Sequence, residues 1–348
     1  MKYENIISEI PSKVIVYKLR IYINAKERIQ MSIHHHNHPY MTIHDFKSNS
    51  HIGWDNSVKP IAEVDSGQTI TYEITEASGG QFTKNSTKKD VANLDFGKVN
   101  PVAGPLYVKG AEPGDTLEVE ILDFSQLDWG WTALIPGFGL LADEFKEPAI
   151  KTFDLSKKNK IEFLDGIDLF IKPFPGTVGV ALPEEGNHSI VPPRKNGGNM
   201  DSRHLTRGTK LYLPVWMEGA LFSIGDTHAA QGDGEVCGTA VEASMETTVR
   251  LKLHKGKSIK EPRYEIPGPP TPEADSQGYY VTTGHGEDIY KAAQNAIRYM
   301  IEHLVDTYKM TDEEAYMLCS VAVDLRISEI VNMPNCLVSA FLPNSIFR

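Results

Sequence analysis

Residues 221–242 concentrate side chains that bind metal ions and transfer protons. The segment LFSIGDTHAAQGDGEVCGTAVE holds two aspartates, one histidine, two glutamates, one cysteine and four glycines between apolar runs. Asp226 and His228 lie two residues apart in a stretch typical of a strand, so both side chains should point to one face of a sheet. A carboxylate and an imidazole in this arrangement can bind one divalent cation. Burying the pair without partners would cost several kcal/mol, which favours a functional role.

Other acidic and histidine side chains could complete such a site. Glu242 lies on the strand expected after the QGDG turn, although its register with the Asp-His pair cannot be read from the sequence. Asp201 and His204, three residues apart in GGNMDSRHL, meet only on a helical turn, and we favour Asp201. His51 in HIGWDNS and Asp95 in VANLDFGKVNPVAGP lie in turn-rich segments, where binding groups are commonly displayed.

Nucleophilic catalysis is an alternative within the same segment. Cys237 stands in GEVCG near His228, and its thiolate could attack a carbonyl carbon if a base activated it. The acidic neighbours Asp233 and Glu235 would raise the pKa of the thiol, which disfavours this role. No GxSxG motif is present, so a serine nucleophile is less favoured still. The SGG sequence at 78–80 could donate backbone amides to an oxyanion.

The composition excludes several classes of partner. The chain has 348 residues and a formal net charge of −11 without a basic stripe, so we predict no binding to nucleic acid. No run reaches the roughly 18 apolar residues of a spanning helix, so we predict no membrane association. Three cysteines without CxxC spacing indicate neither a disulfide framework nor a zinc cluster. Together with an N-terminus unlike a secretory signal, this favours the cytoplasm.

The order of sequence patterns predicts one composite α+β unit. Residues 1–40 form an N-terminal extension that we expect to be poorly ordered, and the catalytic unit spans 41–348. Within it, short alternating runs between Gly, Pro, Asn and Asp make 41–254 rich in strands, in the manner of packed sheets or a β-sandwich. Five prolines between 255 and 279 indicate an extended linker, and 280–348 forms a helical C-terminal portion.

Two helices are expected in the C-terminal portion. A helical apolar stripe runs through residues 293–305, and a second helix begins at TDEEAYMLCSVAVDL. Thr311 and Glu314 make the capping-box pattern there. The extension, in contrast, carries a run of histidines for which we expect only loose, adventitious metal binding: His34, His35, His36 and His38.

Several ordered motifs together resemble the acetamidase/formamidase family. They are GWDNS, ASGGQ, ANLDFGKVNPVAGP, GWGWTALIPGFGLLADEF, GGNMDSRHL, LFSIGDTHAAQGDGEVCGTAVE and CSVAVDLRISEIVNMPN, and the resemblance runs from about His44 to the C-terminus. It implies an amidohydrolase that converts short aliphatic amides such as formamide and acetamide to a carboxylate and ammonia. It also implies a β-rich fold with a C-terminal α/β portion, a bound divalent metal and a homo-oligomer, a dimer or a tetramer.

The resemblance and the ligand chemistry together suggest roles for the candidate residues. Amide hydrolysis needs a polarised carbonyl and an activated water, and a divalent ion can serve both needs. We expect Asp226, His228 and Asp201 to hold the ion, with His51 or Asp95 as a further ligand; zinc is favoured, and calcium or manganese remain alternatives. Glu242 would act as general base towards water and as acid towards the leaving nitrogen, with His228 beside it.

Substrate binding is expected in a small enclosed pocket, because formamide offers almost no apolar surface. We predict that Gln231, Trp131 and Phe138 contact the substrate, the two aromatic residues coming from DWGWTALIPGFGLL. Core packing or a subunit contact is an equal alternative for the aromatic turn. Two other functions stay open: an amidase that uses Cys237 covalently, and a metal-stabilised protein that binds a small ligand without turnover.

Overall fold

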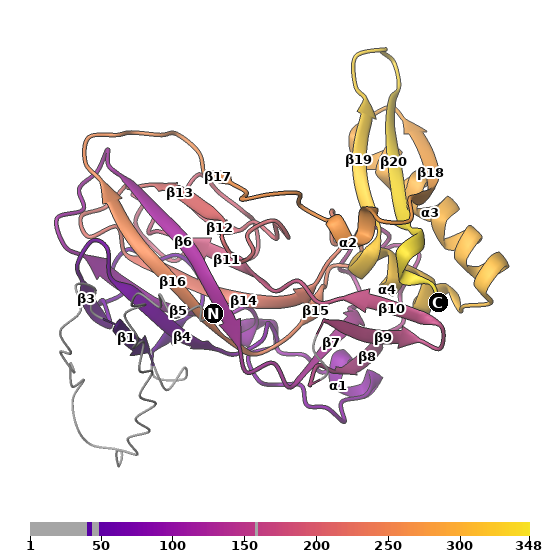
Figure 1. Cartoon of the computed structure of the whole chain (residues 1–348), viewed down its shortest axis with the longest axis horizontal. Coiled ribbons are helices and arrows are strands. Elements are labelled where there is room, and N and C mark those ends of the chain that lie inside the picture. The colour runs from indigo at the N-terminus through magenta and orange to yellow at the C-terminus, as the bar shows by residue number, and fades with distance from the viewer. Residues whose placement is uncertain (1–39, 44–48, 157–158) are drawn as a thin grey trace, which may run out of the picture. The chain divides into compact units, whose positions relative to one another are not determined.

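The computed structural model describes residues 40–43, 49–156 and 159–348. The histidine run at 34–38 and nearly all of the expected extension 1–40 therefore lie outside the described residues. Strands far outnumber helices in the described part, and they form several sheets (Figure 1). The prediction of an α+β fold that is predominantly β is confirmed.

A six-stranded sheet forms one layer of the β-rich body. Its strands alternate buried and exposed side chains, as β16 shows by burying Met245, Thr247, Val249 and Leu251 on one face. The sheet runs in the order β1 (Tyr40–Ile43), β4 (Thr69–Ile74), β16 (Met245–His254), β6 (Thr116–Ser125), β13 (Lys210–Pro214) and β17 (Arg263–Glu265).

A nine-stranded sheet forms the second layer. Its strand β14 is buried along its whole length, which matches the nearly continuous apolar run around the chemical motif. The main path is β12 (Gly197–Asn199), β11 (Phe174–Gly179), β14 (Phe222–Ala230), β15 (Val241–Glu242), β7 (Trp129–Leu134) and β8 (Ala149–Asp154); β5 (Val102–Val108) pairs with β14, and β2 (Ser50–His51) and β3 (Ala62–Val64) pair with β5.

The two large sheets pack face to face around an apolar core. Ile70, Val119 and Leu251 from the first sheet share one buried cluster with Leu106 and Phe222 from the second. Burial of such side chains contributes about 1.5–3 kcal/mol each relative to exposure, so this core holds the sheets together. β14 is thereby fixed on one side by the sandwich.

The C-terminal portion covers the other end of the nine-stranded sheet. It carries α3 (Ile289–Tyr308) and α4 (Asp312–Ala322) beside a sheet of β18 (Tyr279–Gly286), β20 (Cys336–Pro343) and β19 (Asp324–Glu329) (Figure 1). The predicted capping box is present, because the Thr311 hydroxyl accepts from Glu314 N and the Glu314 carboxylate accepts from Thr311 N. A second apolar core joins these helices to β7, β8 and β14.

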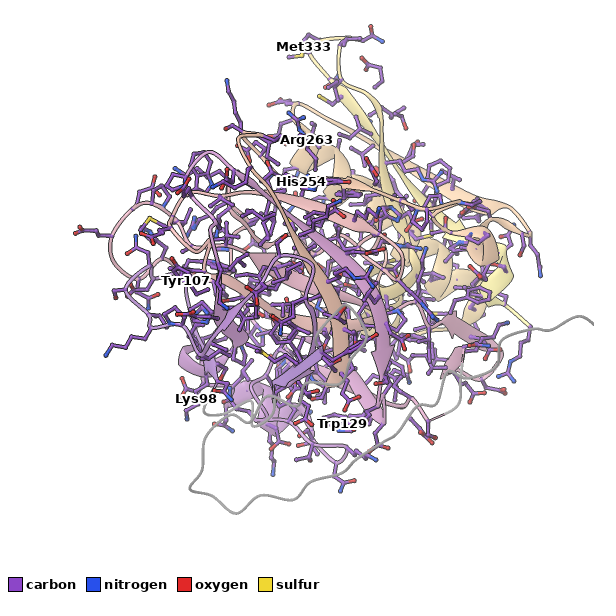
Figure 2. All side chains as sticks on the ribbon, turned by 60° about the vertical axis from the view of Figure 1, so that its left-hand side comes forward. Lys98, Tyr107, Trp129, His254, Arg263 and Met333 are labelled. Carbon is purple, nitrogen blue, oxygen red and sulfur yellow. The ribbon has the colours of Figure 1, made fainter. Side chains whose placement is uncertain are left out.

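The remaining elements are short. They are α1 (Lys88–Ala92), α2 (Pro272–Asp275), the 3-10 helices Phe96–Lys98 and Asn344–Ile346, and the hairpin of β9 (Lys160–Leu164) and β10 (Ile167–Phe170). Exposed apolar side chains gather at the loop between β19 and β20, where Met333 lies at the tip (Figure 2). None of the helices in the described part of the chain has the length and hydropathy of a transmembrane span.

Candidate functional site

The predicted Asp-His pair lies on β14 and is completed from the neighbouring strand. Asp226 Oδ1 lies 3.2 Å from His228 Nε2, so the two side chains do share a face. Glu242 is the register partner of His228 on the antiparallel strand β15, and its Oε2 lies 3.1 Å from the same Nε2. The register that the sequence left open thus places Glu242 directly opposite His228. All three side chains are buried.

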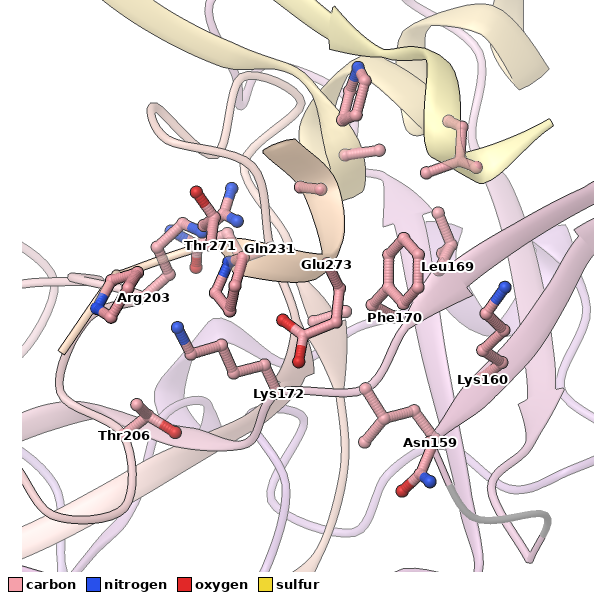
Figure 3. Close-up of a pocket in the computed structure, with 18 of the residues that line it drawn as sticks. Asn159, Lys160, Leu169, Phe170, Lys172, Arg203, Thr206, Gln231, Thr271 and Glu273 are labelled. Carbon is pink, nitrogen blue, oxygen red and sulfur yellow. The ribbon is translucent and has the colours of Figure 1, made fainter. Parts of the chain in front are cut away.

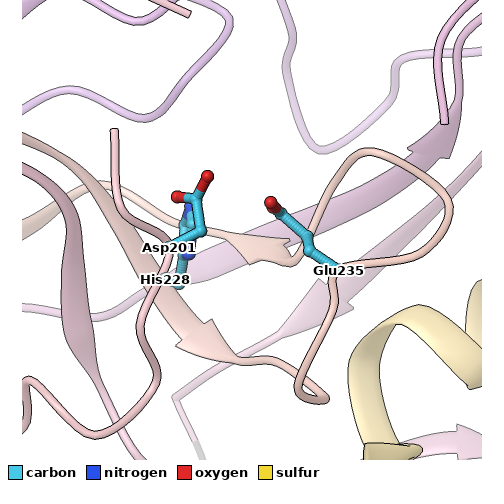
Figure 4. Close-up of side chains that lie close together, drawn as sticks. All are labelled: Asp201, His228 and Glu235. Carbon is cyan, nitrogen blue, oxygen red and sulfur yellow. The ribbon is translucent and has the colours of Figure 1, made fainter. Parts of the chain in front are cut away.

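Two further carboxylates face this group. Asp201, just after β12, and Glu235, in the loop between β14 and β15, have ligand atoms within 4.8 Å of one another and of His228. Figure 4 shows the Asp201 and Glu235 carboxylates on either side of a gap, with His228 next to Asp201. The structure therefore assembles four carboxylates around one imidazole.

A strand glycine makes room for this assembly. Gly176 on β11 lies beside Asp226 across the β11–β14 pair, because Pro175 faces Thr227 and Thr177 faces Gly225. A Cβ atom at position 176 would lie 2.5 Å from Asp201 Oδ1 and 2.7 Å from His228 Cε1. It would also lie 2.9 Å from Asp226 Oδ2. The close approach of the ligand atoms therefore requires glycine here.

Several cluster residues have a backbone conformation that is unfavourable for them. Nine non-glycine residues of the described part have φ in the left-handed region, and four of these line one cavity: Asn100 at 53°, Asp201 at 43°, Asp226 at 55° and Glu235 at 45°. Such conformations cost of order 1–3 kcal/mol each where the surroundings impose them, and they concentrate at functional sites. Their clustering here supports a functional role.

Burial and mutual repulsion raise the pKa values of the cluster's carboxyl groups. Burial, and then the neighbouring Asp226, raise the pKa of Asp201 to about 7. Burial raises the pKa of Glu242, and burial with Asp201 raises that of Glu235 well above its ordinary value. Burial alone would lower the pKa of His228, but the Glu242 and Asp226 carboxylates raise it well above its usual range. Uncompensated carboxylates at this density are costly.

Gln231 fixes the orientation of His228. Its Oε1 lies 3.0 Å from His228 Nδ1, and its Nε2 donates to the Asp201 carbonyl at 2.7 Å. An amide oxygen can only accept, so Nδ1 carries the proton and Nε2 is turned towards the carboxylates. The amide group of Gln231, predicted to contact substrate, is thus engaged with the cluster itself.

A polar chain orients the other oxygen of Asp226. The Thr177 hydroxyl lies 3.2 Å from Asp226 Oδ2 and 2.7 Å from Asn199 Oδ1. Asn100 donates its amide to Thr177 Oγ1 and to Asn199 Oδ1, at 3.3 and 3.2 Å. Hydrogen-bond partners behind a ligand group hold it in place and tune its basicity.

The cluster opens into a cavity of about 440 Å³. Asp201, Asp226, Glu235 and Glu242 all line it, and so do the three side chains predicted to bind substrate: Gln231, Trp131 and Phe138. The volume falls in the range of roughly 300–1,000 Å³ that is typical of ligand sites, and it exceeds what formamide fills. The cavity is therefore larger than the small pocket expected for formamide.

Glycine and glutamate position the two aromatic walls. The Phe138 ring lies against Gly238, where an added Cβ would be 2.4 Å from Phe138 Cδ1. Trp131 donates its indole N–H to the buried carboxylate of Glu76 at 2.7 Å. The same carboxylate accepts from Ser78 N at 2.7 Å and Gly80 N at 3.0 Å. The SGG amides are therefore engaged by Glu76, which corrects their expected role towards an oxyanion.

The structure does not bring His51 or Asp95 to the cluster. His51 Nδ1 lies 2.9 Å from Gly53 O and its Nε2 lies 2.8 Å from Ser223 Oγ, so both ring nitrogens are engaged elsewhere. Asp95 begins a 3-10 helix, where it accepts from Gly97 N and pairs with Lys98 at 3.0 Å. The turn-rich sequence around Asp95 therefore reflects a helix N-cap, a role that aspartate commonly fills. Neither residue lies in the cluster of Asp201, Asp226, His228, Glu235 and Glu242.

Cys237 lies outside the cluster. Its side chain is fully buried, its thiol faces the carbonyls of Ala133 and Thr239, and it does not line the cavity. Burial raises the pKa of the thiol, and among the described residues no imidazole forms a hydrogen bond with it. His204, which was the less favoured candidate beside Asp201, has its Nε2 3.6 Å from Asp233 Oδ2.

We predict that Cys237→Ser leaves amide turnover largely intact. The hydroxyl can donate to the same carbonyls, so the change should cost stability modestly, by roughly 1 kcal/mol, and kcat by less than tenfold. Steady-state kinetics and thermal unfolding check this. A loss of about a thousandfold or more in kcat from a folded variant would instead assign covalent chemistry to the thiol.

Two cluster residues had no signal strong enough to identify them in advance. Glu235 reads as an acidic residue in a glycine-rich turn, and its proximity to Asp201 depends on the path of two loops. Gly176 reads as an ordinary strand glycine in FPGTVG. A glycine in an otherwise apolar strand does indicate a close approach of neighbouring atoms, but the sequence does not say by which atoms.

Comparison with known proteins identifies the family. The sequence model of the Acetamidase/Formamidase family matches residues 39–187 and 182–348. The formamidase of Methylophilus methylotrophus is 28% identical, covering 86% of this chain and 89% of the relative. The crystal structure of an acetamidase from Bacillus halodurans has a TM-score of 0.61 at 32% identity, covering 87% of this chain and 96% of that chain.

A third similar protein is a solved structure of an enzyme named for a cyclic amide. A gamma lactamase from Delftia acidovorans has a TM-score of 0.81 at 25% identity, covering 88% of this chain and 93% of that chain. The ordered motifs, the fold and the family match over both parts of the chain agree with one another. The chain therefore belongs to the acetamidase/formamidase family of amidases.

Proposed function

We propose that the protein hydrolyses short amides at a divalent metal held by Asp226, His228 and Asp201, with Glu242 as the general base. The observation that carries this proposal is the donor set: four carboxylates and one imidazole converge in a cavity, and among the described residues no lysine or arginine pairs with them. Oxygen and imidazole ligands together suit zinc, and calcium or manganese where oxygens dominate.

The buried polar atoms also fit a metal. Asp201 Oδ1 is buried and accepts no hydrogen bond from the described residues, so it is available to bind an ion. Buried carboxylate oxygens are otherwise satisfied in native proteins. A bound divalent ion would supply Lewis acidity towards the amide carbonyl and would favour attack by water at neutral pH.

The chain's own groups then handle the protons. Water oxygen bonds to the amide carbon, the carbon–nitrogen bond breaks, and a proton must pass from the water to the leaving nitrogen. Glu242 is held at Oε1 by Ala240 N at 2.9 Å, which leaves Oε2 facing His228 and supports its role as the base. Glu235 lies across the gap from Asp201 and lines the cavity, so it is a second group placed to carry the proton (Figure 4).

The cavity supports amides larger than formamide as additional substrates. Trp131 and Phe138 give it apolar walls, and its volume of about 440 Å³ leaves space beyond a one-carbon substrate. Because one methylene is worth only about 1–3 kcal/mol in selectivity, formamide and acetamide should both react. Hydrolysis of a cyclic amide is a second candidate, favoured by this volume and by the TM-score of 0.81 to a gamma lactamase.

Ammonia release after chelation tests the proposal. Purified protein is assayed with formamide, acetamide, propionamide and 2-pyrrolidinone, before and after chelation, and again with zinc, manganese or calcium restored. We expect activity to fall at least about a hundredfold on metal removal and to return with one ion, as the loss of a Lewis acid requires. Full activity in a preparation shown to contain no metal would contradict the metal-dependent mechanism. Ring opening of the lactam, followed by chromatography of the amino acid formed, would favour the second candidate.

We also propose a cytoplasmic, homo-oligomeric enzyme, a dimer or a tetramer. Cys237, Cys319 and Cys336 are free thiols and all are buried, which supports a reducing compartment. The exposed apolar loop between β19 and β20, with Val331 and Met333, supports a contact between subunits (Figure 2). Sedimentation of the full chain, compared with Met333→Glu, measures the oligomeric state.

A further inference from the structure

A second, larger cavity lies behind the candidate active site. Its volume is about 700 Å³, and its walls come from β10, the loop after β12, the proline-rich segment 266–274 and the ends of α4 and β20. Gln231 lines both cavities, so the second cavity adjoins the candidate active site. Figure 3 shows Lys172, Arg203, Gln231 and Glu273 around its centre.

The lining of this cavity is basic in an acidic protein. Four cationic side chains face it against one acidic side chain, Glu273, whereas the chain as a whole carries a formal charge of −11. The cations are Lys160, Lys172, Arg203 and Arg207. A concave surface of one sign focuses its field and concentrates ligands of the opposite charge.

Three of the four cations already have partners. Arg203 forms a buried ion pair with Asp324, Arg207 lies 3.7 Å from Asp123, and the Lys160 ammonium lies 4.7 Å from the centre of the Phe170 ring. The charges of these three side chains are therefore already partly compensated.

Lys172 differs from the other three. Within the described part of the chain its ammonium makes no hydrogen bond and no ion pair within 4 Å, although Glu273, Asp233 and Asp275 attract it over a longer range. Burial, and then the nearby Arg203, lower the pKa of Lys172. Figure 3 shows its ammonium pointing into the cavity. An anion there would supply the partner that the ammonium lacks.

The rest of the lining is apolar. Leu169, Phe170, Ile266, Val321 and Ile346 contribute to the walls. Inorganic anions gain nothing from such surfaces, whereas a ligand with an apolar body and one charged end gains from both kinds of wall. The lining of the cavity therefore suits a ligand that has an apolar body and one negatively charged end.

We propose that this cavity binds an organic carboxylate, with the carboxylate paired to Lys172 and the apolar part against Phe170 and its neighbours. The carboxylate can have two sources. One is the acid released by the enzyme's own reaction, which rests on the proposed function. The other is an unrelated carboxylic acid, which does not. The shared wall at Gln231 places the ligand next to the residue that orients His228.

Fluorine NMR titration of the full-length protein tests the site. 4-Fluorobenzoate and acetate are the probes, and 4-fluorobenzyl alcohol is the uncharged analogue. We expect saturable binding of 4-fluorobenzoate to the wild type, and Lys172→Met should weaken it about tenfold or more, the loss of one charge-assisted hydrogen bond. The matched control is Lys257→Met, since Lys257 is exposed and outside the cavity.

The variants also localise the ligand. A carboxylate held at the catalytic cluster would bind equally to Lys172→Met and to the wild type, so equal dissociation constants would overturn the proposal. Equal binding of the alcohol, or no saturation with either acid, would overturn it too. Competition by acetate at similar concentrations identifies the reaction product as the ligand, and binding of the larger acid alone identifies an unrelated carboxylate. Amide turnover, measured separately, should be unchanged in both lysine variants.

Discussion

His228→Ala should release the divalent ion and reduce amide turnover by at least about a thousandfold. His228 is the only imidazole of the described cluster. It lies within reach of Asp226 and Glu242 in one group of potential ligands and of Asp201 and Glu235 in the other. A Lewis acid contributes several kcal/mol to the transition state, and about 1.4 kcal/mol corresponds to a factor of ten in rate. Metal content by mass spectrometry, together with kcat/KM for acetamide, measures both effects.

The control for this prediction separates ligand loss from unfolding. His285→Ala removes an exposed imidazole from β18, so its metal content and turnover should equal those of the wild type. Circular dichroism of His228→Ala should retain the β-rich spectrum, because the truncation leaves a pocket that water can fill. A folded His228→Ala protein with full metal occupancy would remove His228 from the ligand set.

Local sequence patterns predicted two features that the structure contains. The Asp226–His228 spacing correctly predicted a shared face, because a strand alternates its side chains and β14 is a strand at both residues. The Thr311 capping box was equally local and is confirmed. Strand alternation and helix capping both involve residues that are close in sequence, so they can be predicted without knowledge of the fold.

Contacts between distant segments could not be predicted in the same way. Glu242 meets His228 because the 231–240 loop has the length and glycines that set the β14–β15 register. Glu235 approaches Asp201 because both loops adopt left-handed φ at these residues. His51, chosen for its residue type, lies against Ser223 instead, 172 positions away. Residue type alone therefore indicated which side chains could bind a metal. Which of them lie together depends on how the sheets and loops pack.

Gly176→Ala should reduce metal affinity by about 10- to 100-fold or more while the protein stays folded. The new methyl carbon would lie within 3.0 Å of atoms from Asp201, His228 and Asp226, so these side chains must move apart. Changes that only disturb ligand orientation already cost about 10- to 100-fold in affinity or activity. Isothermal titration of the metal-depleted protein with zinc measures the change directly.

A second glycine gives the matched control for this methyl group. Gly268 has no atom within 4 Å of an added Cβ and no left-handed φ, so Gly268→Ala should bind metal as the wild type does. The added methyl group at Gly176 displaces only side-chain atoms, so the backbone pairing of β11 with β14 should persist. We therefore expect only a small shift in the thermal unfolding temperature and a large loss of metal affinity. Unchanged zinc affinity in Gly176→Ala would mean that Asp201, Asp226 and His228 do not bind one ion together. A Gly176→Ala protein that is folded, depleted of metal and inactive would tie the amidase activity to the tight convergence that this glycine permits.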